Sequence, residues 1–165
     1  ESIGTPVRRP KRQKYNLGSI VAIPLPEGKY AFGKVYRDQK AIFDLVLDHI
    51  PEVSVVRQRS ILFFHYGTDE GIKNGLWPVI GEEPFADLED AWGPPKAMFY
   101  DRAENRWTMG GVPYVDHKGK EWVTTLEHVQ GLEIMKVSPT VESFVRSIVN
   151  RLIKGNHEEY KVRAS

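Results

Sequence analysis

The sequence predicts a mainly β fold of the α+β class: a curled antiparallel sheet, or a small partly open β-barrel, with one C-terminal amphipathic helix packed on it. Residues 18–35 have the alternating pattern of a β-hairpin. Short, aromatic-rich segments separated by turn signals follow from residue 97 to residue 125, at the spacing of all-β proteins. Residues 139–154 carry apolar side chains at helical spacing. These three observations define the fold class.

The hairpin pattern of residues 18–35 turns at Pro26-Glu27-Gly28-Lys29. Successive side chains of a strand point to opposite faces, so Tyr30 and Phe32 share one face. Gly33, in the middle of the second strand, predicts a β-bulge, a sharp bend or the close approach of another backbone. Small curled barrels need such a position in order to close.

The segments between the hairpin and residue 81 are short. Strands are predicted at residues 41–48, 53–56, 60–66 and 76–81, and one helical turn at residues 72–75. The segment 60–66 is almost entirely apolar, which is typical of a central strand. Pro78 cannot donate a ladder hydrogen bond, so the segment 76–81 is predicted to lie at an edge.

The second half of the chain adds further short strands and the helix. Strands are predicted at residues 97–100, 106–109, 112–115 and 121–125, then a turn or short helix at 126–131 and an extended piece at 132–137. Ser138 is a suitable N-cap for the helix, and Pro139 fits its first turn. Gly155 can adopt the left-handed conformation that ends a helix.

A chain of 165 residues is most simply one domain. We expect this domain to span residues 15–155, between a flexible basic arm at 1–14 and a loosely held tail at 156–165. The sequence has no cysteine, which excludes disulfides, thiol catalysis and thiolate-bound metals and fits a cytoplasmic location. No apolar run approaches the ~20 residues of a membrane span, so no membrane partner is expected.

No catalytic, cofactor-binding or metal-binding motif is recognisable, so we expect a protein that is not an enzyme and holds no cofactor. His65 lies in an apolar segment, where a hydrogen-bonded core histidine is the simplest interpretation. His117 lies beside Asp116 and near Glu121. A metal site or a hydrolase built on these three residues is a weaker alternative, because ordinary hairpin turn chemistry explains the same residues.

Charge is distributed unevenly along the chain. Residues 1–40 carry a formal charge of +6, residues 41–104 carry −7, and residues 105–165 carry +2. Such asymmetry bears on partners and association rates rather than on the fold. The acidic excess is concentrated in a long loop, residues 82–95, which also contains large apolar side chains. Loops of this length are usually functional or mobile.

Aromatic anchors surrounded by charges are typical of protein–protein interfaces, because the aromatics provide affinity and the charges steer the partner. The alternative is that Phe85 and Trp92 cover the core and the acids only keep the loop solvated. The predicted partner-binding residues are Glu82, Glu83, Phe85, Asp87, Glu89, Asp90 and Trp92.

A second candidate function is nucleic-acid binding by a small β-barrel module. Its basic residues, all in the arm, are Arg8, Arg9, Lys11, Arg12 and Lys14. Cations of this kind bind nucleic acid by neutralising phosphates. Trp107, Tyr114 and Trp122 could provide a face on which bases stack. Their strands lack interleaved Lys or Arg, however, which favours core packing.

The stretch Gly18-Ser-Ile-Val-Ala-Ile-Pro-Leu-Pro-Glu-Gly-Lys-Tyr-Ala-Phe-Gly-Lys-Val35, together with Leu76-Trp-Pro-Val-Ile-Gly81, resembles the immunity protein 26 family of bacterial polymorphic toxin systems. The resemblance covers residues 15–135 and carries no catalytic motif. Members are typically small, β-rich cytosolic proteins encoded beside a secreted or contact-delivered toxin. The resemblance implies that this chain protects its producer by binding a cognate toxin domain. A basic, nuclease-type domain would suit the acidic loop.

Overall fold

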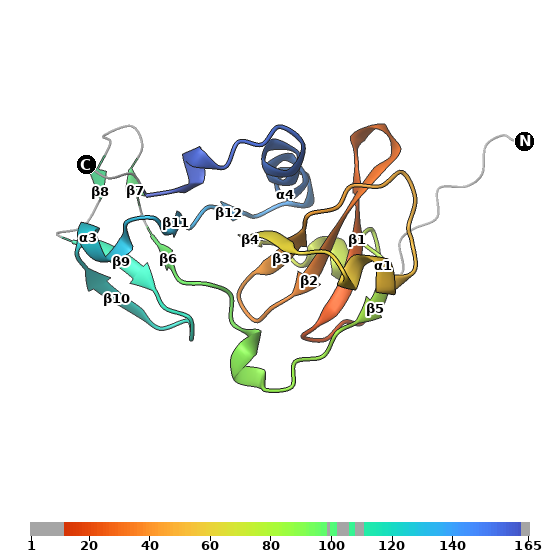
Figure 1. The fold of residues 1–165 in the computed structure, drawn as a ribbon, viewed down its shortest axis with the longest axis horizontal. Coiled ribbons are helices and arrows are strands. Elements are labelled where there is room, and N and C mark those ends of the chain that lie inside the picture. Colours follow the sequence, from red (N-terminus) through yellow and green to blue (C-terminus); the bar gives the residue numbers. More distant parts are fainter. Residues whose placement is uncertain (1–11, 99, 102–105, 108–110, 163–165) are drawn as a thin grey trace, which may run out of the picture.

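Two mixed β-sheets lie beside each other, and the C-terminal helix lies over the larger one (Figure 1). The computed structural model describes residues 12–98, 100–101, 106–107 and 111–162. The prediction of a mainly β fold with one C-terminal helix is confirmed. The strands of the described part of the chain form open sheets and not a closed barrel.

The larger sheet, on the right in Figure 1, has six strands. Their order is β12 (Val137–Ser138), β4 (Ile61–Gly67), β3 (Lys40–Phe43), β2 (Lys29–Val35), β1 (Ser19–Leu25) and β5 (Val79–Glu82). Neighbours are antiparallel except β12 and β4, which are parallel. The edge position of β5 confirms the prediction made from Pro78, whereas β3 is shorter than the strand predicted at 41–48.

The smaller sheet, on the left in Figure 1, has four strands, and the remaining elements are short. Its order is β10 (Glu121–Thr124), β9 (Val112–Val115), β6 (Lys96–Ala97) and β11 (Glu133–Ile134), with β11 and β6 parallel. A separate ribbon pairs β7 (Tyr100–Asp101) with β8 (Arg106–Trp107). The α-helices are α1 (Val53–Arg57), α2 (Glu70–Lys73), α3 (Leu126–Val129) and α4 (Val141–Ile148).

The β1–β2 hairpin forms as predicted, with a 3₁₀ turn at Pro26–Gly28. Glu27 and Gly28 both have a positive φ, of 65° and 70°, which lets the chain reverse within three residues. Of the three alternatives predicted at Gly33, the bulge does not occur, because the β1–β2 register runs through this residue without a shift. The nearest backbone atom to a Cβ at this position would be Ala41 O, at 3.4 Å. The irregularities lie elsewhere, between Ile20 and Val21 of β1 against β5 and at the end of β3.

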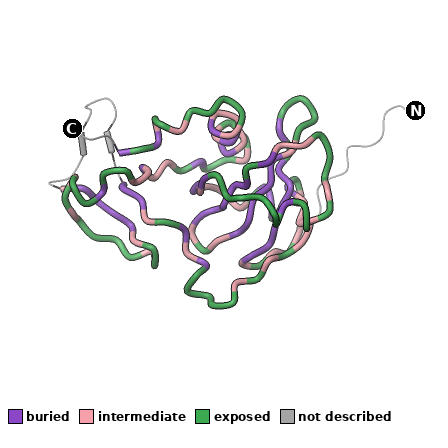
Figure 2. Tube along the Cα trace, viewed as in Figure 1, coloured by how far each residue is buried: buried purple, intermediate pink, exposed green. Residues whose placement is uncertain are grey.

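Both faces of the hairpin are buried, which places it at the centre of the fold. On one face, Val21 and Ile23 pack in a core that α4 covers with Phe144. On the other face, Ile20 and Phe32 belong to a second core that α1 closes. Figure 2 shows the buried residues concentrated along these strands. The alternating side chains of the hairpin therefore face two different hydrophobic cores, rather than one core and the solvent.

The prediction of a strand at residues 53–56 is wrong, because this segment forms α1. As a helix it directs Val56, which is fully buried, into the second core. Val53 packs so closely on Gly81 of β5 that a Cβ there would overlap its side chain. Valine favours strands, but packing against the sheet decides the conformation of this segment.

The C-terminal helix starts later than predicted. Thr140 is the N-cap, and it forms a capping box with Ser143 in which each side chain bonds the other's backbone N–H. Ser138, the predicted cap, belongs instead to β12. After α4 the chain continues through one π-helical turn, Val149–Ile153, and Gly155 takes the expected left-handed conformation with φ of 71°.

Both described ends of the chain are held against the domain, where the sequence predicts an arm and a tail. The backbone N–H of Gln13 donates to Lys73 O (2.8 Å), and its side-chain amide donates to two further carbonyls. Tyr160 and Val162 are buried, and Val162 N–H donates to Leu132 O (2.8 Å). Apolar side chains and paired amides therefore hold the described residues of both segments, 12–14 and 156–162.

A methyl group at Gly67 should destabilise the protein. Its Cβ would overlap the ring of Phe144 and come within 2.8 Å of Ser138 O. We expect Gly67→Ala to lower the free energy of unfolding by about 1–3 kcal/mol, measured by chemical denaturation. Gly33→Ala is the control, because the nearest atoms to its Cβ lie at 3.4 Å. A loss at Gly67 no larger than the loss at Gly33 would contradict this account.

Candidate functional site

The acidic loop, residues 82–95, connects the two sheets along one side of the molecule (Figure 1). Its middle forms a 3₁₀ turn, Leu88–Ala91, which Asp87 caps by accepting a hydrogen bond from Glu89 N–H (3.0 Å). Ala91 is fully buried, and its carbonyl accepts from Arg37 N–H (2.8 Å). The loop is therefore a folded element with a defined backbone.

The two acids at the start of the loop already have partners. Glu83 receives hydrogen bonds from Lys34 Nζ (2.9 Å) and from Arg57 Nε (3.1 Å). The Lys34 bond is the largest cause that holds the pKa of Glu83 below its usual range, and Arg57 adds to it. Glu82 is exposed and accepts from Asn16 Nδ2 (3.2 Å). Glu83 thus compensates a buried lysine and contributes little free charge.

The two predicted aromatic anchors are half-buried inside the molecule. Phe85 lies under the ammonium of Lys34, 4.3 Å from its ring centroid, and edge-to-face with Tyr36 at 4.9 Å. Trp92 lies beside the guanidinium of Arg37 (5.6 Å) and closes on Gly119, where a Cβ would meet its ring within 2.5 Å. Phe85 thus packs on the larger sheet, and Trp92 joins the loop to the β9–β10 turn.

The exposed part of the loop is its tip. Asp87, Glu89 and Asp90 are exposed, and Leu88 between them is 57% exposed. The structure therefore divides the seven predicted residues. Three acids stand together at the tip, Glu83, Phe85 and Trp92 hold the loop in place, and Glu82 is exposed at the end of β5. Sequence reasoning missed Lys34 and Arg57, whose pairing with Glu83 spans 49 and 26 residues and has no local signal.

The residues of the nucleic-acid alternative are only partly within the described structure. Arg8, Arg9 and Lys11 lie outside the described residues, while Arg12 and Lys14 are exposed. Tyr114 is buried in the core of the smaller sheet, as the packing interpretation expects. Trp122 stacks on it, with ring centroids 6.0 Å apart, and is half exposed. Trp107 lies in β8, and its side chain is outside the described set.

The structure separates the two histidines considered above: His65 is part of the core, and His117 is at the surface. His65 is 2% exposed, and its Nε2 lies 2.7 Å from Ser138 Oγ, which confirms the interpretation as a core histidine. His117 is exposed in the β9–β10 turn. Asp116 Oδ1 accepts from the N–H groups of Lys118 (2.8 Å) and Lys120 (2.9 Å), as turn chemistry predicts. No group of three potential ligands is placed to hold a metal ion among the described residues.

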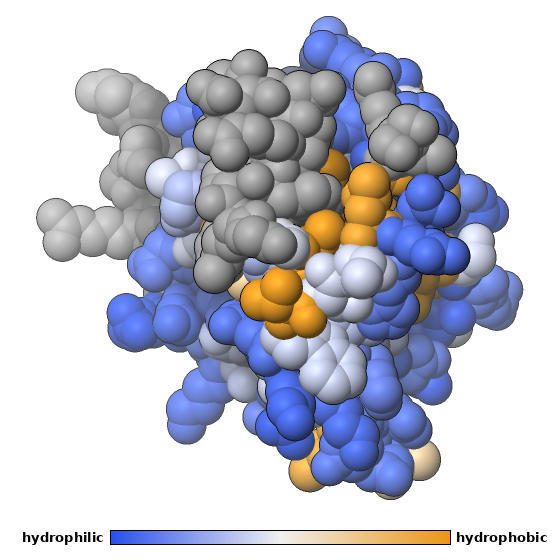
Figure 3. All heavy atoms as spheres, turned by 90° about the vertical axis from the view of Figure 1, so that its left-hand side faces the viewer, coloured by the Kyte–Doolittle hydropathy of each residue, from blue (hydrophilic) through white to orange (hydrophobic). Residues whose placement is uncertain are grey.

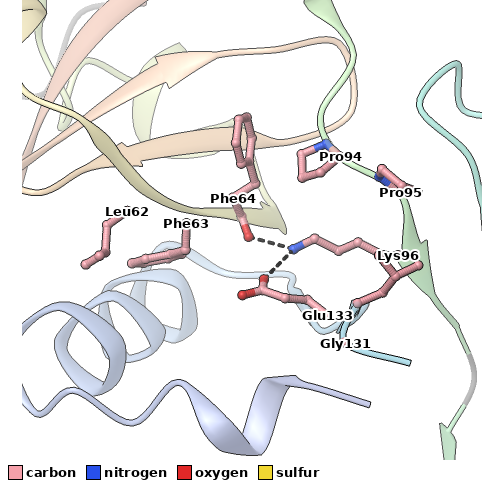
Figure 4. Close-up of a pocket in the computed structure, with 9 residues that line it drawn as sticks. Leu62, Phe63, Phe64, Pro94, Pro95, Lys96, Gly131 and Glu133 are labelled. Atoms are coloured by element: carbon pink, nitrogen blue, oxygen red, sulfur yellow. Dashed lines mark hydrogen bonds and ion pairs between the residues drawn. The ribbon is translucent and has the colours of Figure 1, made fainter. Parts of the chain in front are cut away.

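A pocket of about 260 Å³ lies where the two sheets meet (Figure 4). Three segments line it: 62–64 of β4, 94–96 at the start of β6, and 131–133 at the start of β11. The side chain of Lys96 reaches across it, and its Nζ donates to Phe64 O (2.6 Å) and to Glu133 Oε1 (3.2 Å). A single amine therefore connects both sheets.

Glu133 binds a second buried cation. Arg151, from the π-helical turn, donates to Glu133 through Nη1 (3.0 Å) and Nη2 (2.5 Å). Its guanidinium lies between the rings of Phe63 (4.2 Å) and Tyr160 (4.4 Å). Burial lowers the pKa of Lys96 to about 8, against the opposing charge of Glu133. Burial acts to raise the pKa of Glu133, but Arg151 and Lys96 outweigh it and lower that pKa.

The fold and surface define a mainly β protein whose two sheets are bridged by an acidic loop with an exposed tip. None of the described helices has the length and hydrophobicity that crossing a membrane requires. The chain belongs to the immunity protein 26 family, whose model matches residues 16–108, more than half of its length. This confirms the resemblance read from the hairpin, although the match ends before residue 135. No match was found among curated proteins or among solved structures.

Removing the charge of Glu133 should destabilise the protein strongly, because two buried cations would lose their shared carboxylate. We expect Glu133→Gln to lower the free energy of unfolding by about 3–5 kcal/mol. Glu142→Gln is the matched control: Glu142 pairs with Arg146 (3.5 Å) on the exposed face of α4, so its loss should cost under about 0.5 kcal/mol. Equal losses in the two variants, measured by urea unfolding, would contradict the role assigned to Glu133.

Stability should fall on acidification because of His65. Burial, aided by the charges of Lys96 and Arg151, lowers the pKa of His65 from 6.5 to about 3. Between these values the unfolded chain binds a proton that the folded chain rejects, so this group makes stability decrease as the pH falls from 6.5 towards 3. Near pH 5 its contribution to the slope approaches about 1.4 kcal/mol per pH unit.

The measurement is the free energy of unfolding between pH 4.5 and 6.5 for the unaltered chain and for His65→Gln. The variant should have a shallower slope in this window, whatever its absolute stability. His117→Gln provides the control in which an exposed histidine is removed. An unchanged slope in His65→Gln would overturn the assignment.

Proposed function

We propose that this protein neutralises a cognate bacterial toxin domain by binding it and occluding its working surface, without catalysis of its own. The family is the starting point, since the chain matches the immunity protein 26 model over residues 16–108. The proposal places this action in the cytoplasm of the producing cell and takes residues 15–155 as the binding domain. Its partner is a toxin domain with a basic face, such as a nuclease-type domain.

The observation that carries the proposal is the tip of the acidic loop. Asp87, Glu89 and Asp90 are exposed around Leu88, the one large hydrophobic side chain of the loop that is exposed. Exposed carboxylates raise the rate of encounter with a basic partner, and a desolvated apolar side chain slows dissociation. The folded backbone of the loop presents this group in one conformation, which reduces the entropy lost on binding.

The most direct test is co-expression with the toxin domain encoded next to this chain. Cells that express the toxin should survive only when the chain is present, and the two proteins should purify as a complex. Survival without a complex, or a complex without protection, would contradict occlusion by binding.

Within that complex, the tip should control the association rate. We expect Glu89→Gln with Asp90→Asn to slow association several-fold at low salt and to flatten its salt dependence, measured from about 50 to 500 mM salt by stopped flow. Glu127→Gln with Glu142→Gln is the matched control, because it removes the same charge from two exposed positions outside the loop. Association that is independent of salt in the unaltered protein would exclude steering by these acids.

A further inference from the structure

Among the strands that the structure describes, β10 forms an outer edge of the smaller sheet, with β9 as its one neighbour. Two large apolar side chains on this short strand are exposed, Trp122 to 49% and Val123 to 60%. Figure 3 looks at this end of the molecule and shows apolar side chains at the surface among hydrophilic ones. An exposed strand edge with apolar side chains is a template for pairing with another strand.

The hydrogen bonds of the neighbouring strands establish which backbone groups of β10 face outward. Asp116 N–H donates to Lys120 O (2.9 Å) across the turn, so this pair is hydrogen-bonded. Inward and outward groups alternate along antiparallel strands. Glu121 and Val123, opposite Val115 and Pro113, therefore point their N–H and C=O groups away from β9.

The other side of β9 gives the same result. Pro113 has no N–H, and its carbonyl accepts from Met98 N–H (2.8 Å) on the side of β6. Pro113 cannot then exchange hydrogen bonds with Val123. In the part of the chain that the structure describes, the outward N–H and C=O groups of Glu121 and Val123 take part in no hydrogen bond with another group.

We propose that β10 pairs antiparallel with β10 of a second copy of this chain, with Glu121 of each copy opposite Val123 of the other. This two-fold register uses all the outward groups, two N–H and two C=O per copy, in four hydrogen bonds between the chains. It places the two Trp122 side chains directly opposite each other in a non-hydrogen-bonded pair, where side chains come closest.

Charge disfavours one of the two neighbouring registers. Shifting the pairing by one step of the ladder would set Glu121 against Glu121, and like charges directly opposite are destabilising. In the proposed register Glu121 faces Val123 and Lys120 faces Thr124, so no like charges meet. A second copy therefore complements this edge in hydrogen bonding and sets no like charges opposite each other. Four-residue strands form a small interface, so the dimer should be weak and concentration-dependent.

The test is analytical ultracentrifugation of the full chain from about 10 to 500 µM, a range suited to a small interface. The average mass should rise from 18.9 kDa towards twice that value. Val123→Pro should stay monomeric: it removes an outward N–H and no bond within the chain, and edge strands tolerate proline. Val123→Thr keeps the N–H and the β-branched side chain, and should dimerise like the unaltered chain.

Trp122→Lys is a second disrupting variant, which would set two cations opposite each other and leaves the backbone unchanged. It decides the outcome if circular dichroism shows that Val123→Pro is unfolded. A mass of 18.9 kDa at every concentration would overturn the proposal. So would a dimer that persists in the folded disrupting variants, since another surface would then form it. The acidic-tip variants should dimerise normally, which separates this result from the test of toxin binding.

Discussion

The arrangement of the two sheets depends on the ion pairs that the carboxylate of Glu133 forms. This carboxylate is shared by Lys96, which starts β6, and by Arg151, which follows α4. Lys96 in turn donates to a carbonyl of β4 in the larger sheet. Both cations are almost completely buried, so each would be strongly unfavourable without this acid. One acid thus holds three segments together where the two sheets meet.

A second set of charges fixes the acidic loop in a comparable way. Buried Lys34 requires an anion, and Glu83 provides it while also binding Arg57. At the other end of the loop, Trp92 packs on the β9–β10 turn through Gly119. Between these two contacts, residues 86–90 are left exposed. The loop therefore uses part of its acidic and aromatic content for its own conformation, which leaves a smaller and better-defined surface for a partner.

Local patterns in the sequence were sufficient for some elements and insufficient for others. The β1–β2 hairpin and the C-terminal helix could be predicted because alternation, turn residues and helical spacing lie within one segment. Segment 53–56 could not, because its valines favour a strand and only the neighbouring β5 makes a helix the better packing. The cluster around Glu133 left no local trace, since its members lie 37 and 18 residues apart. Which residues of the acidic loop are exposed also depends on contacts between residues far apart in the sequence, so local patterns could not predict it.

The segment that matches the family ends at residue 108, but residues that follow it complete the buried parts of the structure. Lys96 lies inside the matched segment, whereas Glu133 and Arg151 lie beyond it. The same holds for the core above β1 and β2, which Phe144 and Ile148 of α4 complete. The matched segment therefore contains a buried cation, Lys96, whose carboxylate partner lies in the C-terminal third of the chain. It also contains an apolar face of the larger sheet that α4, from the same third, covers. It follows that this third is part of the folding unit, and that the acidic loop owes its position to both parts of the chain.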